Sequence, residues 1–299
     1  MTAVPTSDGF TLYAESTGSG LPILFIHEFA ADHRTWAEQV GALSGEFQCI
    51  TYSARGYPPS DVPPEQQAYS YIRAADDAID VLNAFGIDKA HIVGLSMGGF
   101  CALQLGIRYP DRVLSLLVSS AGSGASPANR AAFIVETELV AESFRREGAP
   151  AVAQKFAIAP SRIQLQRKNR SAWNEFVSQL GEHSPEGMAL TVLGVQQSRP
   201  SLYEITEQLR QISAPTLIVN GDEDEAVLEP GLMLKRTVPA AGLLVLPNSG
   251  HALNLEEPAA YNYIVRNFIQ TVESGEWATR DPRSLSSAMG IRDAVDQTP

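Results

Sequence analysis

A glycine-rich turn, G-L-S-M-G-G at residues 94–99, constrains the fold of this chain more than any other segment. It follows an apolar run at residues 91–93 directly and leads into a helical pattern, so it predicts a sharp strand-to-helix turn. A serine on such a turn, here Ser96, takes a strained backbone that holds its hydroxyl above the sheet. The flanking glycines lack Cβ atoms, which lets neighbouring backbone approach closely. The segment therefore predicts a reactive serine at the end of a buried strand.

Short apolar runs that do not alternate with polar residues predict a sheet that is buried on both faces. They occupy residues 22–27, 47–52, 91–95, 113–119, 215–220 and 242–247, after an N-terminal hairpin that begins near residue 2. Helical patterns are found at residues 34–43, 71–85, 98–109 and 258–273. Strands that alternate with helices predict an α/β fold with a mostly parallel, doubly wound sheet.

The strand pattern disappears between residues 121 and 213, where the pattern is mostly helical. This stretch follows the sixth expected strand, and glycine and proline residues interrupt it near residues 148–150, 159–160 and 184–185. We expect a helical cap at 121–213 rather than a set of extra core helices. The α/β core then comprises residues 1–120 and 214–273, and residues 274–299 form a C-terminal extension.

The composition is typical of a globular protein and argues against two classes of partner. Hydrophobic residues make up 44% of the 299 residues, which is enough for a sizeable core. The net charge is −12, from 34 acidic and 22 basic residues, and no basic stripe is present for a nucleic acid or an anionic membrane. We find no signal-peptide pattern and no membrane-spanning apolar stretch. Cys49 and Cys101 are too few for a disulfide framework, so we expect a cytoplasmic protein.

A serine nucleophile needs a base, and the base needs an acid that holds its tautomer. The candidate base is His251, in the loop after the last expected strand, at the sheet edge where Ser96 also lies. The candidate acid is Asp224, just after the penultimate strand, with Asp222 as its competitor. The other four histidines are expected to have structural roles. The chain order serine, aspartate, histidine agrees with the order known for one class of hydrolytic site.

Taken together, these residues resemble the α/β-hydrolase superfamily over about residues 5–271. The turn at 94–99, the S-G-H at 249–251 and the G-D-E-D at 221–224 are similar to its capped branch of serine esterases, lactonases and carbon–carbon hydrolases. The resemblance implies no metal and no organic cofactor. It also implies an oxyanion hole made by the backbone N–H groups of Met97 and Phe29, because Phe29 occupies the donor position after the first buried strand.

Glu28 departs from that resemblance, because the family usually has glycine at this position. A carboxylate beside an oxyanion site repels developing negative charge, and a buried one takes part in acid–base chemistry when its pKa is raised. Glu28 is therefore a candidate additional site residue. The alternative is a structural ion pair, for which Arg34 and Arg55 are the partners we expect. A second departure is Pro58, where glycine is usual.

The function that follows is cleavage of a small or medium carboxylic ester or lactone through an acyl-enzyme at Ser96. A carbon–carbon bond hydrolase with the same three residues is one alternative. A cofactor-free dioxygenase is a more distant one, suggested by the D-H-R at residues 32–34, and a non-catalytic ligand-binding protein is another. The expected partner is a small-molecule substrate, and we expect a monomer or homodimer.

Overall fold

A mixed β-sheet forms the centre of the molecule in the computed structural model, which describes residues 2–285 of the chain. Its strands, within these residues, are β1 (Thr2–Pro5), β2 (Thr11–Thr17), β3 (Leu21–Ile26), β4 (Phe47–Ser53), β5 (Ala90–Leu95), β6 (Val113–Ser119), β7 (Thr216–Gly221) and β8 (Ala241–Leu246). Their order across the sheet is β1-β2-β4-β3-β5-β6-β7-β8. The pairs β1–β2 and β2–β4 are antiparallel and all other pairs are parallel. The mostly parallel sheet that the sequence predicts is confirmed.

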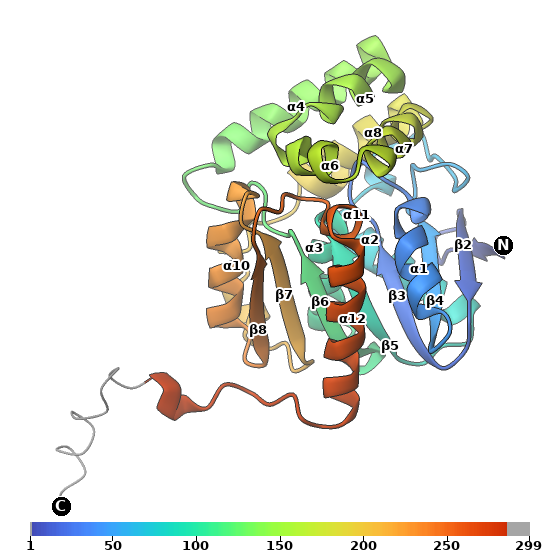
Figure 1. Ribbon diagram of the computed structural model, residues 1–299. Coiled ribbons are helices and arrows are strands. Elements are labelled where there is room, and N and C mark those ends of the chain that lie inside the picture. Colours follow the sequence, from blue (N-terminus) through green and yellow to red (C-terminus); the bar gives the residue numbers. More distant parts are fainter. Residues whose placement is uncertain (1, 286–299) are drawn as a thin grey trace, which may run out of the picture.

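Helices cover both faces of the sheet (Figure 1). The core helices are α1 (Ala37–Leu43), α2 (Tyr71–Ala84), α3 (Met97–Arg108), α10 (Glu225–Thr237), α11 (Leu253–Glu256) and α12 (Pro258–Glu273). Helices α1 and α12 pack on one face, while α2, α3 and α10 cover the other. Strands β3 to β7 are therefore buried on both sides, which explains why their sequences are continuous apolar runs.

The ends of the core helices follow from local sequence. The side chain of Ser70 accepts the Arg73 N–H at 2.9 Å and caps the start of α2. Gly86, just beyond the end of this helix, has φ +68°, a conformation that glycine adopts without steric cost. Pro258 is the first residue of α12, where its missing N–H is not needed.

A layer of helices lies over the carboxyl ends of the strands, between β6 and β7 in the chain (Figure 1). It contains α4 (Arg130–Glu147), α5 (Ala149–Ala157), the 3₁₀ turn η4 (Pro160–Arg162), α6 (Ile163–Lys168), α7 (Arg170–Gly181), α8 (Pro185–Thr191) and the π-helical turn η5 (Val192–Gln197). The short helix α9 (Thr206–Leu209), which follows them, packs instead on α3 and α10 of the core. Helices α4 to α8 and the two turns, which we call the cap, share an apolar cluster that includes Phe144, Leu165 and Leu180. The cap also packs on Phe29, in the loop after β3, so the cap and the sheet enclose the space between them.

The chain beyond α12 begins by packing against the last strand. The Trp277 Nε1–H donates to the Ala240 carbonyl at 2.8 Å, and the Trp277 ring lies 4.7 Å from the Phe268 ring. A Cβ at Gly242 would approach the Trp277 ring to 2.8 Å, so glycine leaves room for the ring here. The remainder of the predicted extension, residues 286–299, lies outside the described residues. No helix within residues 2–285 is long and apolar enough to cross a membrane.

Candidate active site

Ser96 lies on the turn between β5 and α3, as the sequence predicts, with φ 55° and ψ −109°. A serine held at positive φ stores strain of about 1–3 kcal/mol, which the surrounding structure must offset. A Cβ at Gly94 would lie 2.2 Å from the Gly98 carbonyl oxygen, and one at Gly98 would lie 2.0 Å from the Ile26 carbonyl oxygen. Any other residue at either position would therefore force the turn apart. The Ser96 N–H donates to the Ser119 carbonyl at 2.8 Å, which ties the turn to β6.

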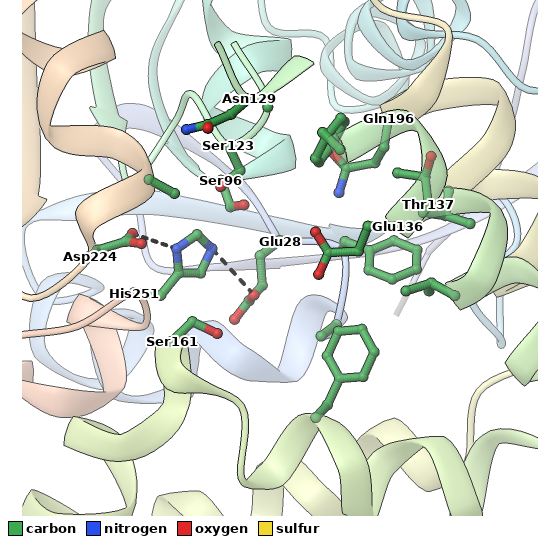
Figure 2. Close-up of a pocket in the computed structure, with 18 of the residues that line it drawn as sticks. Glu28, Ser96, Ser123, Asn129, Glu136, Thr137, Ser161, Gln196, Asp224 and His251 are labelled. Carbon is green, nitrogen blue, oxygen red and sulfur yellow. Dashed lines mark hydrogen bonds and ion pairs between the residues drawn. The ribbon is translucent and has the colours of Figure 1, made fainter. Parts of the chain in front are cut away.

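His251 and Asp224 meet at the same edge of the sheet. The Nδ1–H of His251 donates to Asp224 Oδ2 at 2.6 Å, and both side chains are buried. Asp222, the competing acid, instead accepts the Ser249 N–H at 3.1 Å. The Nε2 of His251 faces the cavity that Ser96 also lines (Figure 2). The structure thus brings Ser96, His251 and Asp224 to one cavity, although Ser96 and His251 are not hydrogen bonded to each other.

The loop that carries His251 is held by Glu256, a residue that the sequence did not single out. The buried Glu256 carboxylate accepts the N–H of Gly250 at 2.6 Å and that of Ala252 at 3.0 Å. These bonds bracket His251 on both sides in the chain. They satisfy buried backbone donors and fix the direction of the imidazole.

The loop after β3 is held by two buried rings. The His27 Nδ1–H donates to the Glu28 carbonyl at 2.7 Å, while His27 Nε2 accepts the Ala54 N–H at 3.0 Å. Tyr57 donates its hydroxyl to the Phe29 carbonyl at 2.8 Å. Because C=O and N–H point in opposite directions in a trans peptide, the bond from His27 turns the Phe29 N–H the other way. Within residues 2–285 this N–H has no hydrogen-bond acceptor.

Glu28 is buried and forms an ion pair with Arg162 of the cap. Arg162 Nη1 donates to Glu28 Oε1 at 2.9 Å, and Nη2 donates to Oε2. The prediction that Glu28 pairs with Arg34 or Arg55 is wrong. Arg34 pairs with Asp32 and Glu182, and Arg55 pairs with Asp8 and Asp77. Both arginines pair with buried aspartates of the core, whereas Glu28 pairs with an arginine of the cap.

These contacts shift two pKa values in the site. Burial disfavours the charged form of His251, but the carboxylates of Asp224 and Glu28 outweigh it and raise the pKa of the imidazole above its usual value. Burial also disfavours the charged form of Glu28. The Arg162 guanidinium and His251 outweigh that effect and hold the pKa of Glu28 below its usual value. Both effects stabilise the charged forms of these two groups.

The cavity between the cap and the sheet has a volume of about 460 Å³. Its wall near the loop after β3 is formed by Glu28, Phe29 and Arg162. Figure 2 shows that polar side chains from the cap side surround the rest of it, among them Ser123, Asn129, Glu136, Thr137 and Gln196. Apolar contact comes from Val140, Phe133 and Phe156. The cavity can therefore take a molecule of mixed polarity and modest size.

The remaining histidines and the cysteines have structural contacts. His33 contacts Ser53 at 2.8 Å, His91 contacts Ser115 at 2.8 Å, and His183 contacts Asp32 at 3.1 Å. The thiols of both cysteines are buried and unpaired. No group of three or more His, Cys, Asp or Glu residues within 2–285 is arranged to hold a metal ion.

Arg162, Glu256 and most of the polar cavity wall carry no signal in the sequence. Arg162 follows a proline break in the cap, and no spacing in the sequence relates it to Glu28. Glu256 lies five residues after His251 in a short helix, and no sequence motif distinguishes it from other acidic residues. Both became evident only from contacts made in the folded chain.

The fold and the strained serine turn define a class of protein, and comparison with known families agrees with it. The α/β hydrolase fold family matches residues 22–258. The chain therefore belongs to the α/β hydrolase fold family.

Three relatives illustrate what the chain is similar to. It is 26% identical to the 3-oxoadipate enol-lactonase 1 of Acinetobacter baylyi, over 90% of this chain and 97% of that protein. It is 27% identical to the 2-hydroxy-6-oxo-6-phenylhexa-2,4-dienoate hydrolase of Burkholderia cepacia, over 87% and 91% respectively. The solved structure of a thermophilic esterase from Thermogutta terrifontis superimposes with a TM-score of 0.79 and 30% identity, covering 91% of this chain and 98% of the esterase.

Proposed function

We propose that this protein is a serine hydrolase that cleaves a small or medium carboxylic ester or lactone. Ser96 attacks the carbonyl carbon after His251 takes the hydroxyl proton, and the N–H groups of Phe29 and Met97 hold the resulting oxyanion. Protonated His251 then gives its proton to the leaving oxygen, which forms an acyl-enzyme. Water activated by His251 releases the acid and restores Ser96.

The observation that carries this proposal is the 2.6 Å hydrogen bond between His251 and Asp224 beside a serine held at positive φ. The acid on Nδ1 leaves the lone pair of Nε2 directed at the cavity, which is the state that a general base needs. A protein that only binds ligands has no use for this arrangement. The bond from His27 to Glu28 supports the assignment of the Phe29 N–H to the oxyanion hole.

The proposed substrate class is supported by the cavity and by the relatives. A volume of about 460 Å³ accommodates a small or medium ester, and the wall offers both polar and apolar contacts. An enol-lactonase and an esterase are among the relatives named above. In this proposal residues 121–213 form the cap over the substrate, while residues 1–120 and 214–273 supply the reacting groups.

The test is hydrolysis of a short-chain p-nitrophenyl ester and of a simple lactone by the purified protein and by Ser96→Ala. We expect turnover by the wild type and its loss in the variant, with an unchanged thermal unfolding temperature. Incubation with a fluorophosphonate and mass spectrometry should place one covalent adduct on Ser96. Equal activity of the wild type and Ser96→Ala would reject the proposal.

A carbon–carbon hydrolase is the second candidate, and the similarity to the Burkholderia dienoate hydrolase favours it. The same three side chains serve both reactions, so the substrate must decide. A ring-cleavage dienoate absorbs visible light and loses its colour on cleavage. Turnover of such a dienoate with no turnover of esters or lactones would replace the first proposal with this one.

We also propose a cytoplasmic location and a monomeric or homodimeric state. Two buried, unpaired thiols agree with a reducing compartment. Light scattering on the purified chain tests the oligomeric state, and an assembly larger than a dimer would reject that part.

A further inference from the structure

The carboxylate of Glu28 occupies a position that works against the proposed reaction. It is 2% exposed, and its Oε2 lies 3.9 Å from His251 Nε2, the nitrogen that must take the serine proton. A negative charge here stabilises the protonated imidazole before any substrate has reacted. It also lies beside the peptide whose N–H, at Phe29, is the proposed oxyanion donor, where it repels developing negative charge.

Arg162 is placed to counter this charge. Its guanidinium binds both Glu28 oxygens, is only 3% exposed, and lies 4.5 Å from the centre of the Phe176 ring in the cap. Two parallel hydrogen bonds and a stacked ring hold a guanidinium in one orientation. Arg162 belongs to the cap, whereas Glu28 and His251 belong to the core. The cap thus supplies a fixed positive charge to the reacting groups.

The other charged groups around this pair come from several elements. Glu136 of α4 lines the same cavity as Glu28. Asp224 contacts His251 from the loop before α10, and the raised pKa of Glu256 in α11 reflects its burial against the same loop. Next to Glu28 in the chain, burial lowers the pKa of His27 to about 4, so that ring is neutral. Among these groups Arg162 is the one with a permanent positive charge.

We propose that Arg162 is a positioning residue, which binds both oxygens of Glu28 and so keeps this carboxylate from sharing a proton with His251 Nε2. Without Arg162, the Glu28–His251 pair binds one proton near neutral pH. That proton lies either on the imidazole or on the carboxyl, which then donates to Nε2. In both forms the Nε2 lone pair is occupied, so His251 cannot accept the proton of Ser96.

This inference rests on the proposed function, and a pair of variants tests it. Arg162→Met removes the positive charge and keeps an apolar stem against Phe176. We expect kcat for the p-nitrophenyl ester at pH 7 to fall at least about tenfold, and the acid limb of kcat/KM to move up by at least about one pH unit. Activity should return toward the wild-type level at high pH, where the pair loses its shared proton.

The double variant Glu28→Gly/Arg162→Met separates this role from a merely structural one. It removes both charges, so we expect kcat at pH 7 to return to within a few-fold of the wild type. A role of Arg162 in cap packing alone predicts no such rescue. The matched control is Glu182→Gln, which removes the 2.7 Å ion pair between Glu182 of the cap and Arg34 of the core. Its pH profile should equal that of the wild type.

Two results would overturn the inference: a wild-type pH profile for Arg162→Met, or no rescue by the double variant. If Arg162→Met does not fold, Glu28→Gln tests the coupling between Glu28 and His251 on which the inference depends. Loss of the charge 3.9 Å from His251 Nε2 should move the acid limb of kcat/KM to lower pH, and an unmoved limb rejects the proposed coupling. Ser96→Ala is measured alongside. Retained activity in that variant rejects the proposed function, whereas its inactivity with an unshifted Arg162→Met rejects only the inference.

Discussion

Replacing Asp224 by asparagine tests the proposed catalytic arrangement most directly. The change keeps the size of a side chain that is 5% exposed, so the fold should be retained. It removes the negative charge 2.6 Å from His251 Nδ1. In addition, an asparagine amide can donate to Nδ1, which places the imidazole proton on Nε2. An Nε2 that carries a proton cannot take another from Ser96.

The size of the effect follows from that distance. At 2.6 Å and an effective dielectric constant of about 20, a carboxylate and an imidazolium attract each other by roughly 6 kcal/mol. This attraction exists only while His251 is protonated, so it stabilises the transition state and not the resting enzyme. Since about 1.4 kcal/mol corresponds to a factor of ten in rate, we expect kcat to fall by about 10⁴. The wrong tautomer has a similar effect, of about 10⁴, in serine proteases.

The assay is steady-state hydrolysis of a p-nitrophenyl ester, with Asp222→Asn as the matched control. Asp222 accepts the Ser249 N–H through Oδ1, which an asparagine oxygen also does, so this variant should stay within a few-fold of the wild type. Thermal unfolding of both variants shows whether each is folded. A loss smaller than about tenfold in Asp224→Asn would refute the reasoning, because the charge would then be too weakly coupled to His251.

Three further predictions concern the charges of the site and the C-terminal packing. The acid limb of kcat/KM should lie above the usual histidine pKa of about 6.5, because Asp224 and Glu28 favour protonated His251 and activity needs the free base. A flat profile from about pH 5 to 9 would contradict this prediction. Glu28→Gly should keep the rate within a few-fold, yet lower the free energy of unfolding by about 3–5 kcal/mol in a denaturant titration, because it leaves Arg162 buried without its partner. Trp277→Ala should lower that free energy by about 0.5–3 kcal/mol, because the ring is half-buried, with no change in ester hydrolysis.

Much of the core could be predicted because its signals are local. The apolar run at residues 113–119 coincides with β6, and the expected last helix at 258–273 coincides with α12. The convergence of Ser96 and His251 was also predictable, since parallel strands end at a common edge of the sheet. The choice between Asp224 and Asp222 depends on the shape of the loop and not on a local pattern. Two residues of loop decide which carboxylate turns toward His251, and only the folded loop shows it.

The partner of Glu28 could not be predicted, for a physical reason. Arg162 is 134 residues away in the chain and reaches Glu28 because the cap packs on the loop after β3. Hydrophobic periodicity in the sequence does not predict such a contact, because the contact depends on how the cap is oriented over the sheet. The partners that we expected, Arg34 and Arg55, are closer in sequence. They are already engaged by buried acids of the core, Asp32 and Asp77.

The ion pair between Arg162 and Glu28 also affects which parts of the chain influence the reacting groups. Strands and turns of the core fix Ser96, Asp224 and His251, so one would expect the cap to influence only the choice of substrate. The ion pair of Arg162 with Glu28 makes the cap part of the electrostatics around His251 as well. A glutamate at position 28 is compatible with the proposed chemistry only while Arg162 of the cap binds its carboxylate. A change in the cap that moves Arg162 would therefore alter the basicity of His251 as well as the shape of the cavity.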